Sequence, residues 1–161
     1  MTQYHNIPPV YDKNSRILIL GSFPSVKSRE AQFFYGHPQN RFWKVMSAVL
    51  DCECPVTKEE KKLMLLSHNI AVWDVIGSCE ITGSSDATIS SVVPNDIAGL
   101  VAETSVTRIF ANGATSYNMY KRYCRDNVGI EAVKLPSTSP ANAAFSLERL
   151  IFEWKSQILS Q

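Results

Sequence analysis

The sequence RILILGSFPSVKSREAQFFYGHPQNRFW, from Arg16 to Trp43, joins a short apolar run to a long polar and aromatic segment. Residues 17–20 are aliphatic and do not alternate with polar residues, which is typical of a strand buried on both faces of a parallel sheet. A loop of small residues and one Phe-Pro pair follows at once, from Gly21 to Ser25. Ligand sites in parallel α/β sheets lie in such loops, at the carboxyl ends of strands. We therefore expect the functional site to begin here.

This loop carries neither the glycine spacing of a dinucleotide-binding motif nor that of a P-loop. It offers backbone amides, hydroxyl groups on both sides of Phe23-Pro24, an aromatic patch at residues 33–35 and the carboxamide of Asn40. Such groups suit a flat, neutral, polar ring that is held near an anionic backbone.

The composition limits the class of protein. The chain has 161 residues, 45% of them hydrophobic, and a net charge of +1, which predicts one globular domain over residues 1–161. Proteins that wrap long DNA non-specifically are usually far more basic. The sequence contains no run of about 18 apolar residues and no signal-like N-terminal order, so we expect a monomeric cytoplasmic protein without a membrane span. The four cysteines form no C-x-x-C pair, so we expect neither a metal nor another cofactor.

Strands and helices are expected to alternate along the chain. This order predicts a single three-layer α/β/α domain with a four-stranded parallel sheet. The expected strands are residues 16–20, 70–75, 107–111 and 131–135, and the expected helices are 41–50, 57–67, 94–102, 114–125 and 143–159. Residues 1–15 are expected to form an extended arm, and residues 76–91 a long loop.

A second loop of small and hydroxyl-bearing residues, PSTSPAN at 136–142, follows the last expected strand. Together with GSFPS at 21–25 and YGHPQNRFW at 35–43, it resembles the motifs of the uracil-DNA glycosylase superfamily. The closest resemblance is to its hypoxanthine-DNA glycosylase branch, also called DNA-deoxyinosine glycosylase, and it extends over nearly the whole chain. Members of this superfamily flip a damaged base out of DNA and cut the bond between base and sugar.

The resemblance implies roles for both loops. It implies that Asn40 is catalytic, that residues 22–25 line the base pocket and touch the DNA backbone, and that residues 137–142 enter the minor groove. The chain departs from many relatives because the first loop lacks their water-positioning Asp or Asn. It also has Ser137 where the best-known uracil enzymes have a histidine. Both departures count against uracil excision.

The chemistry of base excision can be matched to the side chains. Breaking an N-glycosidic bond builds positive charge on the sugar and negative charge on the departing base. The carboxamide of Asn40 could orient a water without titrating, although Asn at this place could also cap the next helix. Aromatic residues could stack on the flipped ring or fill the core beneath the loop. Asp74, at the end of the second strand, could contact the base edge or cap a turn.

The expected site therefore has three parts and no metal ligand. The catalytic residue is Asn40. The expected base-binding residues are Gly21, Ser22, Phe23, Phe34, Tyr35 and Asp74. The expected DNA-binding residues are Pro24, Ser25, Ser137, Thr138, Ser139, Pro140, Ala141 and Asn142.

The predicted function is that of a monofunctional DNA glycosylase that removes hypoxanthine during base excision repair. Its partner would be single- or double-stranded DNA that carries a damaged base. One alternative is a uracil- or thymine-mismatch-specific glycosylase of the same fold. Another is a nucleotide- or DNA-binding module that has no catalytic activity.

Overall fold

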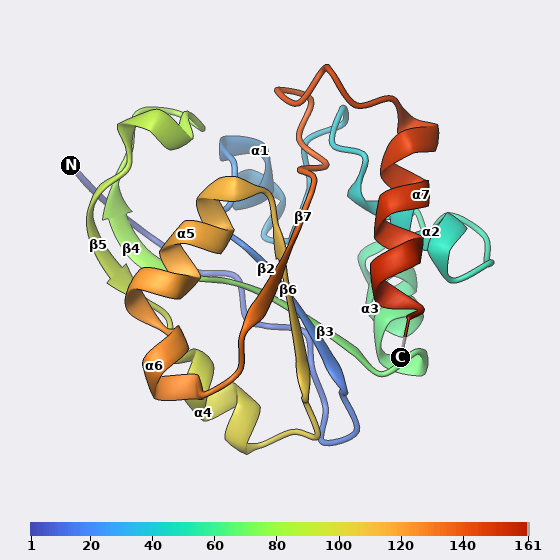
Figure 1. The fold of residues 1–161 in the computed structure, drawn as a ribbon. Coiled ribbons are helices and arrows are strands. Elements are labelled where there is room, and N and C mark those ends of the chain that lie inside the picture. The colour runs from blue at the N-terminus through green and yellow to red at the C-terminus, as the bar shows by residue number, and fades with distance from the viewer. Residues whose placement is uncertain (161) are drawn as a thin grey trace.

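A four-stranded parallel sheet forms the centre of the protein in the computed structural model, which describes residues 1–160 (Figure 1). The strand order is β3-β2-β6-β7. The strands are β2 (Ile17–Gly21), β3 (Ile70–Asp74), β6 (Arg108–Asn112) and β7 (Ala132–Leu135). Each lies within one residue of its expected position, and the prediction of a four-stranded parallel sheet is confirmed.

Helices cover both faces of this sheet (Figure 1). One face is covered by α2 (Phe42–Val49), α3 (Lys58–Ser67) and α7 (Leu147–Ile158), and the other by α4 (Ile97–Ala102), α5 (Ala114–Tyr123) and α6 (Arg125–Val128). Neighbouring strand residues serve opposite faces, because Ile19 packs with the first group and Leu18 with the second. Both faces of each central strand are thus apolar, which explains the absence of alternation in the sequence.

Two helices begin later than their sequence patterns indicated. The last helix was expected from residue 143, but α7 begins at Leu147 because the Ser146 side chain accepts a hydrogen bond from Arg149 N–H and caps the helix there. In the same way Asp96 caps α4, which was expected from residue 94. No helix of residues 1–160 is long and apolar enough to cross a membrane.

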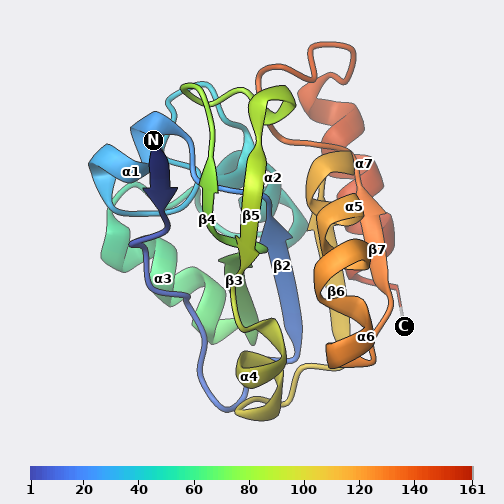
Figure 2. The same cartoon turned by 90° about the vertical axis from the view of Figure 1, so that its left-hand side faces the viewer.

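A second sheet is formed where the sequence indicated irregular chain. Strands β1 (Thr2–Tyr4), β4 (Ile76–Glu80) and β5 (Ser90–Pro94) pair antiparallel in the order β1-β4-β5 (Figure 2). The prediction that residues 76–91 form one long loop is therefore wrong. Pairing with distant residues, including the N-terminal arm, stabilises strands whose small polar residues have low β-propensity. The β4–β5 connection includes a 3-10 turn, η1 (Asp86–Thr88).

The four cysteines are free thiols. Cys52 and Cys54 are exposed, whereas Cys79 and Cys124 are buried. Burial raises the pKa of Cys124 to about 11, which keeps this side chain a neutral thiol at physiological pH. In the part of the chain that the structure describes, no three His, Cys, Asp or Glu side chains gather as metal ligands.

Candidate active site

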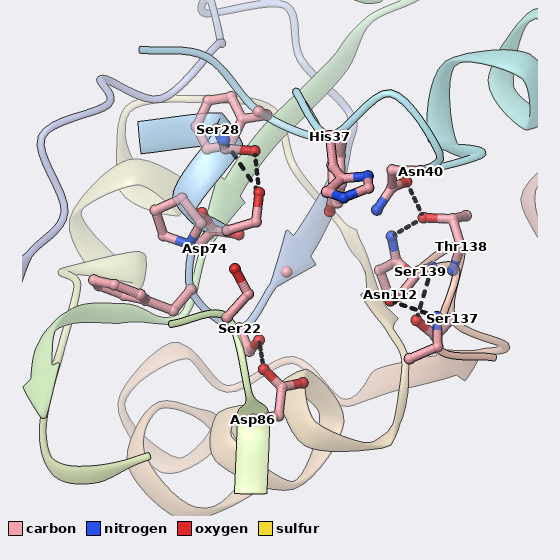
Figure 3. A pocket seen from close by; sticks show the side chains of 18 of the residues that line it. Ser22, Ser28, His37, Asn40, Asp74, Asp86, Asn112, Ser137, Thr138 and Ser139 are labelled. Atoms are coloured by element: carbon pink, nitrogen blue, oxygen red, sulfur yellow. Dashed lines mark hydrogen bonds between the residues drawn. The ribbon is translucent and has the colours of Figure 1, made fainter. Parts of the chain in front are cut away.

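The four parallel strands end at one cavity of about 430 Å³ (Figure 3). Gly21 ends β2, Asp74 ends β3 and Asn112 ends β6, and all three line this cavity. The segment after β7 provides another wall. The helix α1 (Val26–Ala31) begins just beyond the loop after β2. The cavity has the size and position of a small-molecule site in a parallel α/β fold.

Every residue of the expected site except Asn142 lines the cavity. The side chain of Asn142 instead donates from Nδ2 to the main-chain oxygen of Ser137, 3.0 Å away. Asn142 thus stabilises the loop after β7 from within. In Figure 3, Asn40, Asn112 and Thr138 gather on one side of the cavity, and Ser22, Asp74 and Asp86 on the other. The structure therefore brings together the two segments that the sequence singled out.

The carboxamide of Asn40 is held in one orientation. Its Oδ1 accepts hydrogen bonds from the Phe42 backbone N–H at 2.9 Å and from the Thr138 hydroxyl at 2.8 Å. No residue in the range 1–160 hydrogen-bonds its Nδ2, which is left as a donor at the cavity wall. The residue that flanks the start of α2 is Arg41 and no side chain caps this helix, so the Asn40 oxygen binds the N–H of the first helical residue without serving as the N-cap. The amino group is available to a ligand. The alternative that Asn40 is the N-cap of this helix is therefore wrong.

Asn112 is a site residue that sequence reasoning missed. Its Oδ1 accepts from Thr138 N–H and its Nδ2 donates to Thr138 Oγ1, both at 3.0 Å. The Thr138 hydroxyl, fully buried, then donates to Asn40. In the sequence, Asn112 falls between the expected strand 107–111 and the expected helix 114–125, where a turn accounts for it. The signal that could have found Asn112 is its place at the end of a strand, which is also the place of Asp74 in β3.

Arg41 joins the two polar loops. Its guanidinium donates to the main-chain oxygens of Ser139 and Asn142, both at 3.1 Å, and also to that of Phe145. Its backbone N–H donates to the Thr138 oxygen at 3.1 Å. The guanidinium of Arg41 therefore binds main-chain oxygens of the protein itself. Consecutive residues, Asn40 and Arg41, attach the loop after β2 to the loop after β7.

Aromatic side chains form one wall of the cavity. Phe34 is buried and lines it, while Phe33 stacks on Trp43 within the core, with ring centroids 5.9 Å apart. Tyr35 has a left-handed backbone, with φ of 52°, and its ring stacks on Phe42 at 4.0 Å. Burial, with a smaller effect from the Asp74 charge, raises the pKa of Tyr35 far above its ordinary value, so the phenol stays protonated.

The β4–β5 connection provides the wall that sequence reasoning did not include. Ser84, Ser85 and Asp86 line the cavity there. Asp86 Oδ1 accepts from the Ser22 hydroxyl at 3.4 Å, and Ser84 Oγ accepts from the Val26 N–H at 2.9 Å. Desolvation raises the pKa of Asp86 above its ordinary value. These contacts attach the antiparallel sheet to the loop after β2.

Comparison with known proteins places this fold and site in a family. The model of the uracil DNA glycosylase superfamily matches residues 8–159. The chain belongs to this superfamily. The resemblance predicted from the two loop motifs is thereby confirmed, and the match includes all four parallel strands.

Two relatives of this superfamily member are named hypoxanthine DNA glycosylase. The one from Methanosarcina acetivorans is 37% identical over 92% of this chain and 94% of its own length. The one from Methanosarcina barkeri is 32% identical over 84% of this chain and 85% of its own length. A solution NMR structure from Methanosarcina acetivorans, described as that of a candidate uracil DNA glycosylase, superposes with a TM-score of 0.83 at 33% identity. The match covers 98% of this chain and 96% of that one.

Proposed function

We propose that this protein is a monofunctional DNA glycosylase that hydrolyses the bond between hypoxanthine and deoxyribose during base excision repair. The observation that carries the proposal is the Asn40 amino group, which is fixed at the wall of an aromatic-lined cavity between the two loops. Relatives that carry the name hypoxanthine DNA glycosylase, and that this chain matches over 94% and 85% of their length, support the choice of base.

Asn40 would act as a hydrogen-bond donor. Because Thr138 and the Phe42 N–H occupy its Oδ1, the free Nδ2 can hold the oxygen of an attacking water or a polar atom of the departing base. A carboxamide accepts no proton at physiological pH, so its contribution would be positioning and electrostatic stabilisation. The relay from Asn112 through Thr138 would keep the amide in this orientation as the oxocarbenium-like transition state forms.

The flipped base would enter between the strand ends. Gly21, Ser22 and Asp74 would meet its polar edge, and aromatic rings would contact its faces. Stacking of one base on an aromatic side chain contributes about 1–3 kcal/mol. The expected base-binding aromatic residues all line the cavity: Phe23, Phe34 and Tyr35.

The DNA backbone would lie across the rims formed by the two loops. Pro24 and Ser25 form one rim, and residues 137–141 the other, with Pro140 and Ala141 exposed at the tip. Asn142 would act through the shape of this loop. The enzyme would work as a monomer on DNA in the cytoplasm.

The test is an excision assay on labelled duplexes. Each duplex carries a single deoxyinosine, uracil, xanthine or thymine mispair, and alkali then cuts at abasic sites. We expect cleavage at deoxyinosine, lost in Asn40→Ala and retained in Asn118→Ala, a matched change on the exposed side of α5. Preference for uracil would overturn the choice of base. Binding without cleavage of any duplex would overturn the enzymatic function.

A further inference from the structure

A buried histidine lies behind the base pocket and outside the residues matched by the family model. His5 follows β1, whereas the match begins at residue 8. Its Nε2 lies 2.7 Å from Asp74 Oδ2, and the two side chains are only 1% and 5% exposed. The N-terminal segment therefore contacts the carboxylate at the end of β3, across the two sheets.

The hydrogen bonds of His5 indicate which ring nitrogen carries the proton. The Ile7 backbone N–H donates to His5 Nδ1 at 3.3 Å, so Nδ1 is an acceptor and carries no proton. The proton of the neutral ring is then on Nε2 and is donated to Asp74. The rings of Phe23 and Phe34 pack around the imidazole, with centroids 6.1 and 5.9 Å away. The ring is thus held in place on several sides.

This contact leaves one Asp74 oxygen for a ligand. Oδ2 is occupied by His5, while Oδ1 accepts no hydrogen bond from residues 1–160 and is open to the cavity. Oδ1 lies so close to Gly21 that a Cβ there would clash with it. The backbone of Asp74 is held as well, because Asn95 Nδ2 donates to its carbonyl oxygen at 2.9 Å.

We propose that His5 is a positioning residue that sets base selectivity by fixing Asp74 Oδ1 as a pure acceptor toward the flipped base. The inference rests on the proposed function. An ionised carboxylate accepts hydrogen bonds and donates none. Deamination of adenine converts its ring nitrogen from an acceptor into an N–H donor beside a new carbonyl, and a flipped base is read along that edge. The site therefore favours bases with a ring N–H and opposes those with a lone pair in that place.

A different role for the same contact is a structural one, in which His5 only joins β1 to the parallel sheet. The two roles predict different effects of Asp74→Asn. With His5 present, its Nε2–H would hold the oxygen of the introduced amide, so the amide would direct its NH2 group at the base. A donor would then replace the acceptor, and the ring N–H of hypoxanthine would meet another N–H.

The test compares four enzymes: the wild type, His5→Gln, Asp74→Asn and the double variant. In single-turnover assays we expect Asp74→Asn to excise hypoxanthine at least about 100-fold more slowly than the wild type. A site with a wrongly paired polar group rejects its ligand strongly. His5→Gln, which retains an N–H donor, should remain within about tenfold of the wild type. In the double variant the glutamine can present its oxygen to the amide NH2, which turns the amide oxygen toward the base. We expect the double variant to excise hypoxanthine at least about tenfold faster than Asp74→Asn.

The assay distinguishes a failure of the proposed function from a failure of the role proposed for His5. If the wild type excises no hypoxanthine, the proposed function fails before any variant is compared. If the wild type is active and the double variant is no faster than Asp74→Asn, the role of His5 is refuted alone.

If Asp74→Asn does not fold, His5→Leu is tested by binding to duplexes that carry 2′-fluoro analogues of deoxyinosine or deoxyadenosine. The preference for the inosine analogue should fall at least about tenfold. An unchanged ratio would refute the proposal.

Discussion

The two sheets contribute to the cavity in different ways. In the parallel sheet, Leu18, Ile19 and Phe110 are fully buried, and the strand ends that carry site residues are held between two layers of helices. In the antiparallel sheet, β5 has no buried residue, and its connection to β4 is largely exposed, although the groups around the Asp86 carboxyl remove part of its water. Segments with few buried apolar contacts open at low free energy. One half of this site is thus fixed by the core, while the other half is a wall attached by a few hydrogen bonds.

The largest expected difference between the two sheets is in stability. Phe110→Ala should lower the free energy of unfolding by about 3–5 kcal/mol, because a fully buried ring leaves a cavity between β6 and the helices. Val93→Ala, in β5 and 57% exposed, should change it by less than about 0.5 kcal/mol. Urea denaturation of both variants measures the contrast. Equal losses would mean that the antiparallel sheet is as strongly packed as the parallel one.

The next effect concerns the donor on Asn40. Asn40→Asp keeps an oxygen for the Phe42 N–H and the Thr138 hydroxyl but removes the amino group. We expect excision to fall by about 10²- to 10³-fold, the usual cost of one lost transition-state donor. Single-turnover rates give the effect, and a melting temperature near that of the wild type serves as the control. Wild-type excision by Asn40→Asp would show that the donor is not needed.

A smaller effect is expected at Asn112. Asn112→Ala leaves Thr138 N–H and Oγ1 without their partner, at a cost of about 1–3 kcal/mol, so excision should fall about tenfold to a hundredfold. Ser84→Ala, on the opposite wall, removes only the acceptor for the Val26 N–H and should lower the excision rate less than about threefold. The two rates are compared on the same deoxyinosine duplex. A larger loss at Ser84 would reverse the ranking of the two walls.

The smallest effect is a pH dependence at Asp86. Because desolvation raises the pKa of this carboxyl in the folded state above 3.8, its ionisation favours the unfolded state. The stability associated with the protonated form is present at low pH and is lost as pH rises through the folded pKa. Asp86→Asn should therefore raise the melting temperature, relative to the wild type, more at about pH 7 than at about pH 3.5. A difference independent of pH would refute this account.

The parallel half of the fold was predictable because its signals are local. An aliphatic run such as residues 17–20 has few structures available other than a buried strand, and the capping box of Thr57 and Glu60 marks the start of α3 where it was expected. The cavity also followed from the order of strands, since parallel strands place their carboxyl ends together.

The antiparallel half of the fold could not be predicted from local sequence patterns. Residues Gly77 and Ser78 lack the side chains that favour strands, and their partners lie near the N-terminus, at Tyr4 and His5. Such pairing depends on the completed tertiary structure, so a short stretch of the sequence does not predict it. For the same reason the wall at Asp86 and the contact of His5 with Asp74 were missed. Asn112 was missed because its place between an expected strand and an expected helix accounts for an Asn without any role in a site.

The contact between Arg41 and the loop after β7 has a consequence for protein engineering. Arg41 binds main-chain oxygens of Ser139, Asn142 and Phe145, which every amino acid possesses. The attachment is therefore independent of the side chains at the tip, Pro140 and Ala141. A library that varies these two positions would change the exposed rim of the cavity on an unchanged scaffold, and longer side chains could be introduced there without disturbing the hydrogen bonds of Asn40, Thr138 and Asn112.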